Sequence, residues 1–189
     1  MYNFIKYFER WSFIKKIALF GGSFDPPHIG HIEIVYAALS LLDIDKIIIM
    51  PTFLNPFKNH AHADAQLRFS WLNEIFMDEE DVEISSYEVE QGRKVSSYES
   101  VKHLKKEVDK IYLIIGADNL ASLSQWENYA LLKEEVEFVI ATRDDIKIDA
   151  HYIQLKVDHL ISSSALRIDV DEQYIPQAIS KEIANYYKT

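Results

Sequence analysis

Short apolar runs alternate along this chain with longer segments in which apolar residues recur at helical spacing. The runs that we predict as strands are residues 17–20, 46–50, 82–85, 111–115 and 138–142, with a weaker candidate at 152–155. Most are rich in isoleucine and valine without strict alternation, which is typical of parallel strands covered on both faces. The segments that we predict as helices are residues 30–42, 64–76, 97–106, 125–135, 164–169 and 176–187.

This alternation predicts an α/β fold, a Rossmann-like doubly wound parallel sheet with helices on both faces, in a single domain. Asp64 is suited to cap the second helix, and Pro176 suits the first turn of the last one. We expect the domain to span residues 16–189, because no repeat or linker divides this stretch. Residues 1–15 are aromatic and basic and lack the features of a signal peptide, so we expect an N-terminal extension.

Composition limits the partners of the chain. Its 189 residues include 20 Lys and Arg against 30 Asp and Glu, a formal net charge of −10 at pH 7. Such a field repels polyanions, so we expect no nucleic acid, and an anionic ligand must rely on local cations and backbone dipoles. There is no cysteine, and no apolar stretch approaches the roughly 20 residues of a membrane span. We therefore expect a cytoplasmic protein without a membrane span. The protein could also form a homo-oligomer.

The strongest chemical signal follows the first predicted strand, where residues 21–31 run Gly-Gly-Ser-Phe-Asp-Pro-Pro-His-Ile-Gly-His. Two glycines let the backbone approach a ligand closely. His28 and His31 share one face at a predicted helix N-terminus, where free backbone N–H groups favour anions. We therefore predict a phosphate site here. Two alternatives are a zinc site, which lacks an evident third ligand, and a pair of structural histidines.

A second phosphate signal lies near the other end of the chain, where residues 161–167 run Ile-Ser-Ser-Ser-Ala-Leu-Arg. Serines that open a helix offer hydroxyl groups and backbone N–H groups to an anion. Arg167 falls on the same face one turn later and can bind phosphate oxygens through two N–H groups. Alone, this segment is more often a capped surface helix, but together with residues 21–31 it favours a triphosphate site.

With these two segments the chain resembles the bacterial nicotinate-nucleotide adenylyltransferases, in the nucleotidyltransferase superfamily with the His-x-Gly-His motif. Residues 21–31 match the family's Gly-Gly-x-Phe-x-Pro-x-His-x-Gly-His signature, and residues 161–167 resemble its Ile-Ser-Ser-Thr-x-Ile-Arg signature. Residues 113–120, followed by Trp126, are similar to its Gly-x-Asp…Trp segment, and residues 92–98 resemble its Ser-Tyr-Thr region. The likeness spans the chain from about Lys16 to its end.

The resemblance implies that AMP is transferred from ATP to nicotinate mononucleotide, with Mg²⁺, to give deamido-NAD and pyrophosphate. It implies catalytic roles for His28, His31 and Arg167. The ATP site that we expect comprises Gly21, Gly22, Ser23, Phe24, His28, His31, Gly116, Asp118, Ile161, Ser162, Ser163 and Arg167. The mononucleotide site that we expect comprises Lys58, Ser97, Tyr98, Trp126 and Arg143.

The residues by themselves leave alternatives at several of these positions. Asp118 follows an apolar strand and a glycine, which places it at the binding edge of the sheet, where it is also a candidate helix cap. Trp126 is equally a candidate core anchor, and Arg143 a candidate surface residue. No cysteine nucleophile exists and no general base lies near the serines, so we expect in-line attack by an ionised phosphate without a covalent intermediate.

The chain departs from the family pattern at a few positions. Glu99 stands where the family has threonine, Phe57 replaces a histidine before Lys58, and Ser164 and Leu166 are milder changes. A carboxylate at position 99 would repel nicotinate, so we expect its side chain to face solvent. Alternative functions are adenylyl transfer to nicotinamide mononucleotide or phosphopantetheine, and a non-catalytic nucleotide-binding regulator. A class I aminoacyl-tRNA synthetase is disfavoured by the charge and by the missing Lys-Met-Ser-Lys-Ser element.

Overall fold

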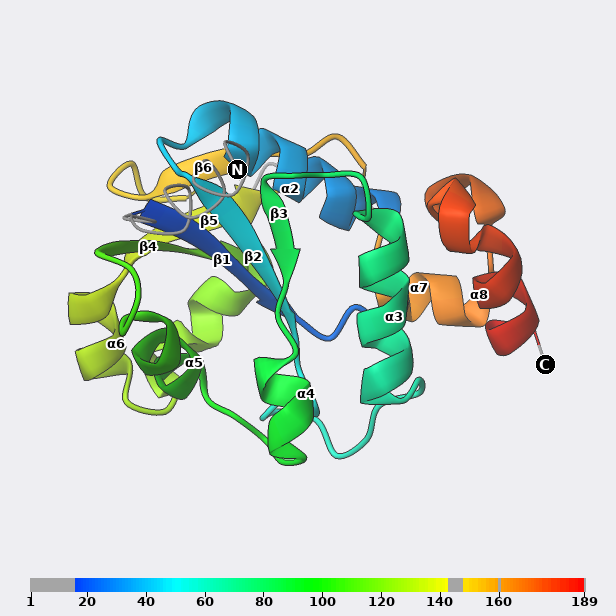
Figure 1. Cartoon of the computed structure of the whole chain (residues 1–189), viewed down its shortest axis with the longest axis horizontal. Coiled ribbons are helices and arrows are strands. Elements are labelled where there is room, and N and C mark those ends of the chain that lie inside the picture. Colours follow the sequence, from blue (N-terminus) through cyan, green and yellow to red (C-terminus); the bar gives the residue numbers. More distant parts are fainter. Residues whose placement is uncertain (1–15, 143–147, 160, 189) are drawn as a thin grey trace, which may run out of the picture.

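A computed structural model describes residues 16–142, 148–159 and 161–188 of the protein. Its strands form one parallel sheet in the order β3-β2-β1-β4-β5-β6 (Figure 1). The strands are β1 (Lys16–Gly22), β2 (Lys46–Pro51), β3 (Val82–Ile84), β4 (Lys110–Gly116), β5 (Glu137–Thr142) and β6 (Ile153–Lys156). All six predicted strands are confirmed. The order reverses between β1 and β4, and ligands bind at such a switch point in open α/β sheets.

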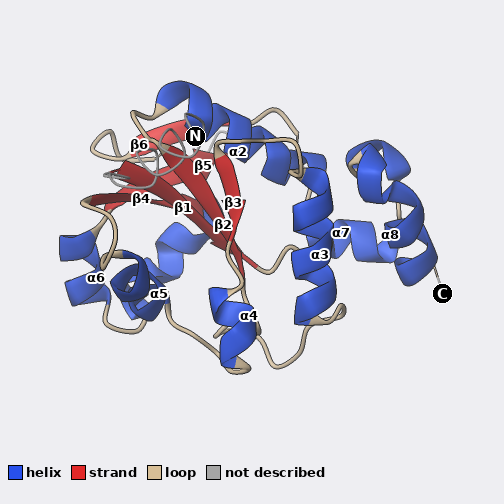
Figure 2. Ribbon diagram, in the orientation of Figure 1, coloured by secondary structure: helices blue, strands red, loops and turns tan. Residues whose placement is uncertain are grey.

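Helices cover both faces of the sheet, as predicted (Figure 2). On one face, Ala18 and Phe20 of β1 pack with residues of α2 (Ile29–Leu41) and α3 (Ala65–Ile75). On the other face, Ile17 and Leu19 pack with residues of α5 (Ser97–Leu104) and α6 (Tyr129–Glu135). Successive residues of a strand point to opposite faces, and a strand buried on both faces must be apolar throughout. This explains the unbroken apolar runs in the sequence.

The C-terminal part of the chain forms a third cluster against α3. Trp71 of α3 packs with Leu166 of α7 (Ser163–Ile168) and with Ile183 of α8 (Ser180–Tyr187). Two short 3₁₀ turns, Glu172–Tyr174 and Gln177–Ile179, connect these helices. In Figure 1, α7 and α8 lie beside α3, at the side of the sheet that β3 borders. This packing brings the last residues of the chain close to the turn after β1.

The structure differs from the predicted elements at three places. The helix predicted over 125–135 begins only at Tyr129, because a 3₁₀ segment, Ala117–Gln125, follows β4. The helix predicted over 176–187 begins only at Ser180, because a 3₁₀ turn that starts after Pro176 precedes it. The predicted cap of α3 by Asp64 is confirmed. The structure also has a helix that the sequence pattern does not predict, α4 (Tyr87–Gln91), since five residues are too few to show a helical period.

The expected N-terminal extension, residues 1–15, lies outside the described residues. Within the described part of the chain, no helix is long and apolar enough to cross a membrane.

A buried arginine joins the loops that follow β1 and β2. Arg68 of α3 is 0 % exposed, and its guanidinium donates to the carbonyl oxygens of Ser23, Thr52, Phe53 and Ala63 at 2.6 to 3.0 Å. The charge is tolerated in the interior because its hydrogen bonds end on carbonyl oxygens and the carboxylates of Asp25 and Asp64 also attract it. One side chain thereby fixes the relative position of two loops at the carboxyl edge of the sheet.

We predict that Arg68→Met lowers the free energy of unfolding by about 3 kcal/mol or more, because each buried carbonyl left without a donor costs about 1–3 kcal/mol. Urea unfolding followed by circular dichroism measures the change. Gln66→Met, on the exposed side of the same helix, is the matched control and should be near neutral. A loss below about 1 kcal/mol for Arg68→Met would show that the loops hold their positions without it.

Candidate active site

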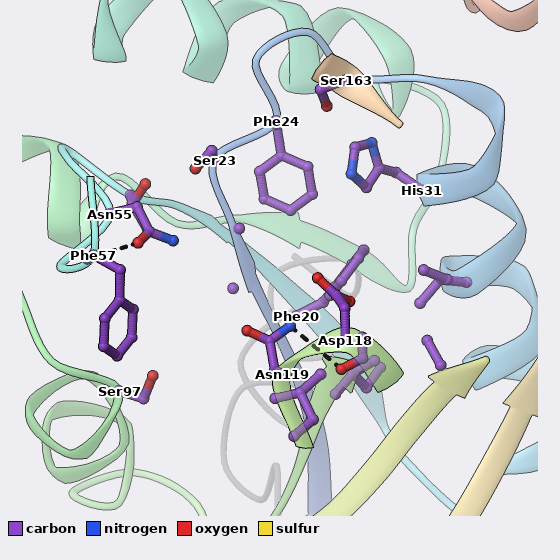
Figure 3. Close-up of a pocket in the computed structure, with 18 of the residues that line it drawn as sticks. Phe20, Ser23, Phe24, His31, Asn55, Phe57, Ser97, Asp118, Asn119 and Ser163 are labelled. Atoms are coloured by element: carbon purple, nitrogen blue, oxygen red, sulfur yellow. Dashed lines mark hydrogen bonds between the residues drawn. The ribbon is translucent and has the colours of Figure 1, made fainter. Parts of the chain in front are cut away.

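A cavity of about 680 Å³ opens at the carboxyl edge of the sheet, where the strand order reverses (Figure 3). The loops after β1, β2, β4 and β6 contribute to its wall. Of the predicted site residues, the structure brings the following into this wall: Gly21, Gly22, Ser23, Phe24, His28, His31, Lys58, Ser97, Gly116, Asp118, Trp126, Ile161, Ser162 and Ser163. Residues from both ends of the sequence thus line one cavity.

The two histidines form a stacked pair at the N-terminus of α2. Their ring centroids lie 3.7 Å apart with the planes 22° from parallel. The backbone N–H of His28 donates to Nδ1 of His31 at 3.2 Å, which makes this imidazole a side-chain cap of the helix. Because Nδ1 is the acceptor, the neutral ring carries its proton on Nε2. His31 therefore has an N–H donor on the edge opposite its cap.

The position of the His31 ring is fixed by packing as well as by the cap. Phe24 meets it edge to face with centroids 4.9 Å apart, and Figure 3 shows the Phe24 ring beside it in the cavity. Gly30 lies under the His28 ring, and a Cβ atom there would come within 3.2 Å of Nδ1 of His28. A side chain at position 30 would therefore crowd the His28 ring, which glycine avoids.

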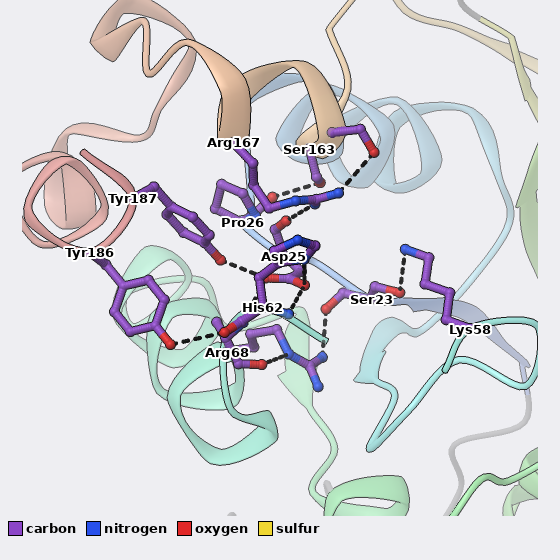
Figure 4. A network of polar contacts seen from close by, with 12 residues as sticks. Ser23, Asp25, Pro26, Lys58, His62, Arg68, Ser163, Arg167, Tyr186 and Tyr187 are labelled. Carbon is purple, nitrogen blue, oxygen red and sulfur yellow. Dashed lines mark hydrogen bonds and ion pairs between the residues drawn. The ribbon is translucent and has the colours of Figure 1, made fainter. Parts of the chain in front are cut away.

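The C-terminal segment is hydrogen-bonded directly to the turn after β1 (Figure 4). The Ser163 hydroxyl donates to the carbonyl oxygen of Pro26 at 2.8 Å. The Arg167 guanidinium donates to the carbonyl oxygen of Asp25 and, at 3.0 Å, to the Ser164 hydroxyl. The predicted convergence of residues 21–31 with residues 161–167 is therefore present in the structure.

Asp25 is the centre of this network, with a side chain that is almost fully buried. Its carboxylate accepts hydrogen bonds from the Tyr187 hydroxyl at 2.5 Å, from His62 N–H at 2.9 Å and from Ala63 N–H at 3.0 Å. Burial alone would raise the pKa of this carboxyl, but these bonds and the charge of Arg167 outweigh it and lower the pKa below its usual value. An ionised Asp25 therefore holds the turn, α8 and the loop before α3 together.

Three predicted site residues are not in the wall of the cavity. Arg167 contacts the turn through the carbonyl oxygen of Asp25, as described, and Tyr98 packs into the core on the α5 face. Arg143 lies outside the described residues. A triphosphate-binding role for Arg167 stays a prediction, and its present contacts support the turn itself.

The structure places the predicted site residues Asp118, Trp126 and Lys58 in the cavity wall, and their binding roles stay predictions. Asp118 is exposed in the first turn of the 3₁₀ segment after β4, and Gly116 rather than Asp118 occupies the N-cap. Trp126 lines the cavity and also packs against the core, and its role in mononucleotide binding stays a prediction. Lys58 reaches the turn from the loop after β2, with Nζ 3.4 Å from the Ser23 hydroxyl.

The structure shows where the two main departures from the family pattern, Glu99 and Phe57, lie relative to the cavity. The Glu99 carboxylate pairs with the Arg93 guanidinium and is not part of the cavity wall, in agreement with the expected outward orientation. Its hydrogen bond with Arg93 lowers the pKa of the Glu99 carboxyl. Phe57 is exposed and lines the cavity, and Figure 3 shows its ring directed toward Ser97.

The wall also contains residues that the sequence pattern does not identify as site residues. Asn119 lies beside Asp118, and its side-chain amide donates to the Gly116 carbonyl at 3.3 Å (Figure 3). Glu88 of α4 also lines the cavity. This residue is buried, which is rare for a carboxylate. Burial raises the pKa of the Glu88 carboxyl to about 7. The sequence signal for both residues is weak, because Asn119 lies in a 3₁₀ segment and Glu88 lies in a helix of about one turn.

The chain is similar to known proteins over most of its length. Residues 19–168 match the cytidylyltransferase-like family. A protein of Sulfurimonas denitrificans with the name "Probable nicotinate-nucleotide adenylyltransferase" is 56% identical over 172 residues, which cover 91% of this chain and 94% of the relative. A protein of Campylobacter fetus with the same name is 47% identical, with 91% of this chain and 96% of the relative covered.

A solved structure shares the fold. The nicotinic acid mononucleotide adenylyltransferase of Plasmodium falciparum, complexed with NaAD, superposes with a TM-score of 0.74 at 21% identity and covers 92% of this chain. The comparison covers 96% of that structure's chain. The fold, the paired motifs in one cavity and the extensive identity to these relatives lead to one conclusion: the chain belongs to the nicotinate-nucleotide adenylyltransferases, nucleotidyltransferase enzymes within the cytidylyltransferase-like family.

Proposed function

We propose that this enzyme transfers AMP from ATP to nicotinate mononucleotide, forming deamido-NAD and pyrophosphate in NAD biosynthesis. The observation that carries the proposal is the single cavity in which the His28–His31 pair meets residues 161–163, joined by the hydrogen bond from Ser163 to Pro26. The names of the relatives and the NaAD complex of the structural neighbour support the same substrates. The catalytic domain in this proposal comprises residues 16–189.

The proposed reaction is an in-line displacement at the α-phosphorus of ATP. A phosphate oxygen of the mononucleotide forms the new P–O bond, the bond from the α-phosphorus to the bridging oxygen breaks, and pyrophosphate leaves with that electron pair. The attacking phosphate is already ionised, so no general base is needed. Catalysis then depends on alignment of the two phosphates and on stabilisation of the charge that develops between them.

The histidine pair is suited to stabilise the charge that develops in the reaction. His31 presents an Nε2–H donor on a ring held by its cap and by Phe24, so the donor is in place before the charge develops. The N-terminus of α2 adds backbone N–H groups and the positive end of the helix dipole at the same place. Lys58 contributes an exposed positive charge from the loop after β2.

We propose that Mg²⁺ enters this site bound to ATP. Among the described residues, no group of three or more His, Cys, Asp or Glu side chains is placed to hold a metal ion. Mg²⁺ commonly binds through substrate phosphates with few protein ligands, which is compatible with this wall. When bound, the ion neutralises charge on the pyrophosphate that leaves.

The direct test of the proposed function is product analysis. With ATP and nicotinate mononucleotide, the purified full-length chain should release pyrophosphate and form deamido-NAD in equal amounts, as measured by mass spectrometry. Parallel reactions with nicotinamide mononucleotide and with phosphopantetheine test the alternative acceptors. Pyrophosphate release with phosphopantetheine alone would replace the proposed acceptor, and nucleotide binding without any product would indicate a regulator.

We expect His31→Ala to lower kcat at least about tenfold, because one preorganised donor to developing charge is worth that much or more. The variant also loses its helix cap, at a cost of about 1 kcal/mol, which thermal unfolding will report separately. His60→Ala, an exposed histidine outside the cavity wall, is the matched control. Wild-type turnover in a folded His31→Ala protein would remove the central role of this residue.

Removal of divalent metal should abolish turnover. In the pyrophosphate assay, EDTA is expected to stop the reaction and excess Mg²⁺ to restore it, because the charge on the leaving group is then again neutralised. Unfolding temperature should be unchanged by EDTA, since the metal is proposed to arrive with the substrate. Full activity in EDTA would contradict the proposal.

A further inference from the structure

The last helix of the chain reaches the turn that carries the histidines, although it lies outside the cavity wall. Tyr187, at the end of α8, donates from its hydroxyl to the Asp25 carboxylate at 2.5 Å (Figure 4). Neither of these two residues lines the cavity. Any effect of their hydrogen bond on the reaction must therefore pass through the turn itself.

The residue before Asp25 has a backbone conformation that phenylalanine rarely adopts. Phe24 has a φ of 49°, in the left-handed region that suits glycine but is costly for a bulky side chain. A residue stays in such a region only where the surrounding structure holds it there. On the N-terminal side of Phe24, the carbonyl oxygen of Ser23 accepts a hydrogen bond of 2.6 Å from Arg68. Asp25 provides the restraint on the other side.

The strained backbone of Phe24 sets the position of an aromatic ring in the cavity. The Phe24 ring lies edge to face against His31, with centroids 4.9 Å apart, and against Phe20 at 5.3 Å. It is also so close to Gly22 that a Cβ atom there would lie 3.0 Å from it. A return of φ to its ordinary range would move the Phe24 ring, and His31 would lose this contact.

The Asp25 side chain holds the turn through bonds to two other parts of the fold. It is 3% exposed, and besides Tyr187 its donors are the backbone N–H groups of His62 and Ala63, in the loop before α3. Of the three, the bond from Tyr187 is the one that a substitution can remove without a change in the backbone. It is also the bond that joins the turn to α8.

Apolar packing of α8 holds the Tyr187 hydroxyl at Asp25. The Tyr187 ring is half-buried against the cluster that contains Trp71 and Ile183, and its centroid lies 6.2 Å from that of Trp71. A phenylalanine at position 187 would keep these apolar contacts and lose only the hydroxyl. The hydrogen bond and the packing of the helix can therefore be tested separately.

We propose that Tyr187 is a positioning residue for adenylyl transfer: its hydrogen bond to Asp25 maintains the Phe24 conformation that holds the His31 ring in place. The inference rests on the proposed function and goes beyond it. It assigns a part in the reaction to α8, although no residue of this helix lines the cavity. Preorganisation of the His31 donor then depends on a hydroxyl near the end of the chain.

The same hydrogen bond gives the reaction a pH dependence. Asp25 faces Tyr187 of α8, Arg167 of α7, Arg68 of α3 and His62, whose Nδ1 lies 3.6 Å from Oδ2 of Asp25. The Tyr187 hydroxyl favours the ionised carboxylate and so lowers the pKa of Asp25. Turnover that needs ionised Asp25 is complete above this pKa and is lost as the pH falls through it. Removal of the hydroxyl raises the pKa, so turnover is lost at a higher pH.

Two neighbouring tyrosines provide the test and its matched control. Tyr187→Phe removes the hydroxyl at Asp25, whereas Tyr186→Phe removes one that donates to the His62 carbonyl at 3.0 Å. Steady-state kinetics of the full chain with ATP and nicotinate mononucleotide give kcat and both KM values from acidic to neutral pH. All assays are run well below the unfolding temperature of each variant, so that loss of the fold does not limit turnover.

We expect Tyr187→Phe to lower kcat about fivefold or more, because a hydrogen bond to a charged group is lost. The KM for ATP should change less than about threefold, since the bond acts on the alignment in the transition state and residues 161–163 are unaltered. The acid limb of the kcat profile should move to higher pH by about 0.5 or more. Tyr186→Phe should stay within about twofold of the wild-type kcat.

Asp25→Asn tests whether the effect passes through Asp25. Asparagine cannot carry the charge, so this variant should itself lower kcat about fivefold or more. In the Asp25→Asn background, the further change Tyr187→Phe should alter kcat less than about twofold, because both substitutions remove the same interaction. Losses that multiply would show that Tyr187 acts by another route.

The inference would be overturned by a wild-type kcat in Tyr187→Phe, by an acid limb that does not move, or by an equal loss in Tyr186→Phe. If Tyr187→Phe does not fold, wild-type turnover of Asp25→Asn also contradicts it. A wild-type enzyme that makes no deamido-NAD would refute the proposed function instead, so the two failures are distinguishable.

Discussion

The Ser163 hydroxyl donates a hydrogen bond to the Pro26 carbonyl at 2.8 Å, and the Arg167 guanidinium donates one to the Asp25 carbonyl. These bonds join segments that are 137 and 142 residues apart in the sequence. On its other side, the Asp25 carboxylate is held by Tyr187 and by backbone N–H groups of the loop before α3. The turn that carries the histidines is thus bonded both to the C-terminal helices and to the loop before α3, and the geometry of the proposed phosphate site depends on this constraint.

A turn fixed in this way suits a reaction that needs alignment more than proton transfer. The chain carries a formal net charge of −10, so local groups must attract the anionic substrates. His31 has its ring position set by the helix cap and by Phe24, and the N-terminus of α2 lies beside it. Donors that are already in place lose little free energy to reorganisation when charge develops, which is how such sites accelerate phosphoryl-type transfer.

Strong local patterns made most of the fold predictable, together with two segments that line the cavity. The apolar runs gave all six strands, and the two signature segments gave residues that do line one cavity. The contact of Arg167 with Asp25 was harder to predict, because it is set by the packing of α7 and cannot be inferred from sequence spacing. Glu88 escaped notice because a five-residue helix has no measurable period and a glutamate in a polar stretch gives no sign of burial. The late start of α6 reflects the 3₁₀ segment after β4, whose shorter repeat the helical pattern does not distinguish.

The most direct measurement is a crystal structure of the full chain with a non-hydrolysable ATP analogue. The account predicts that the triphosphate lies between residues 21–31 and residues 161–163, with a phosphate oxygen within hydrogen-bond distance of His31 Nε2. It also predicts that the bond from Ser163 to Pro26 is retained in the complex. A nucleotide bound away from the histidine pair, or a C-terminal segment separated from the turn, would contradict the account.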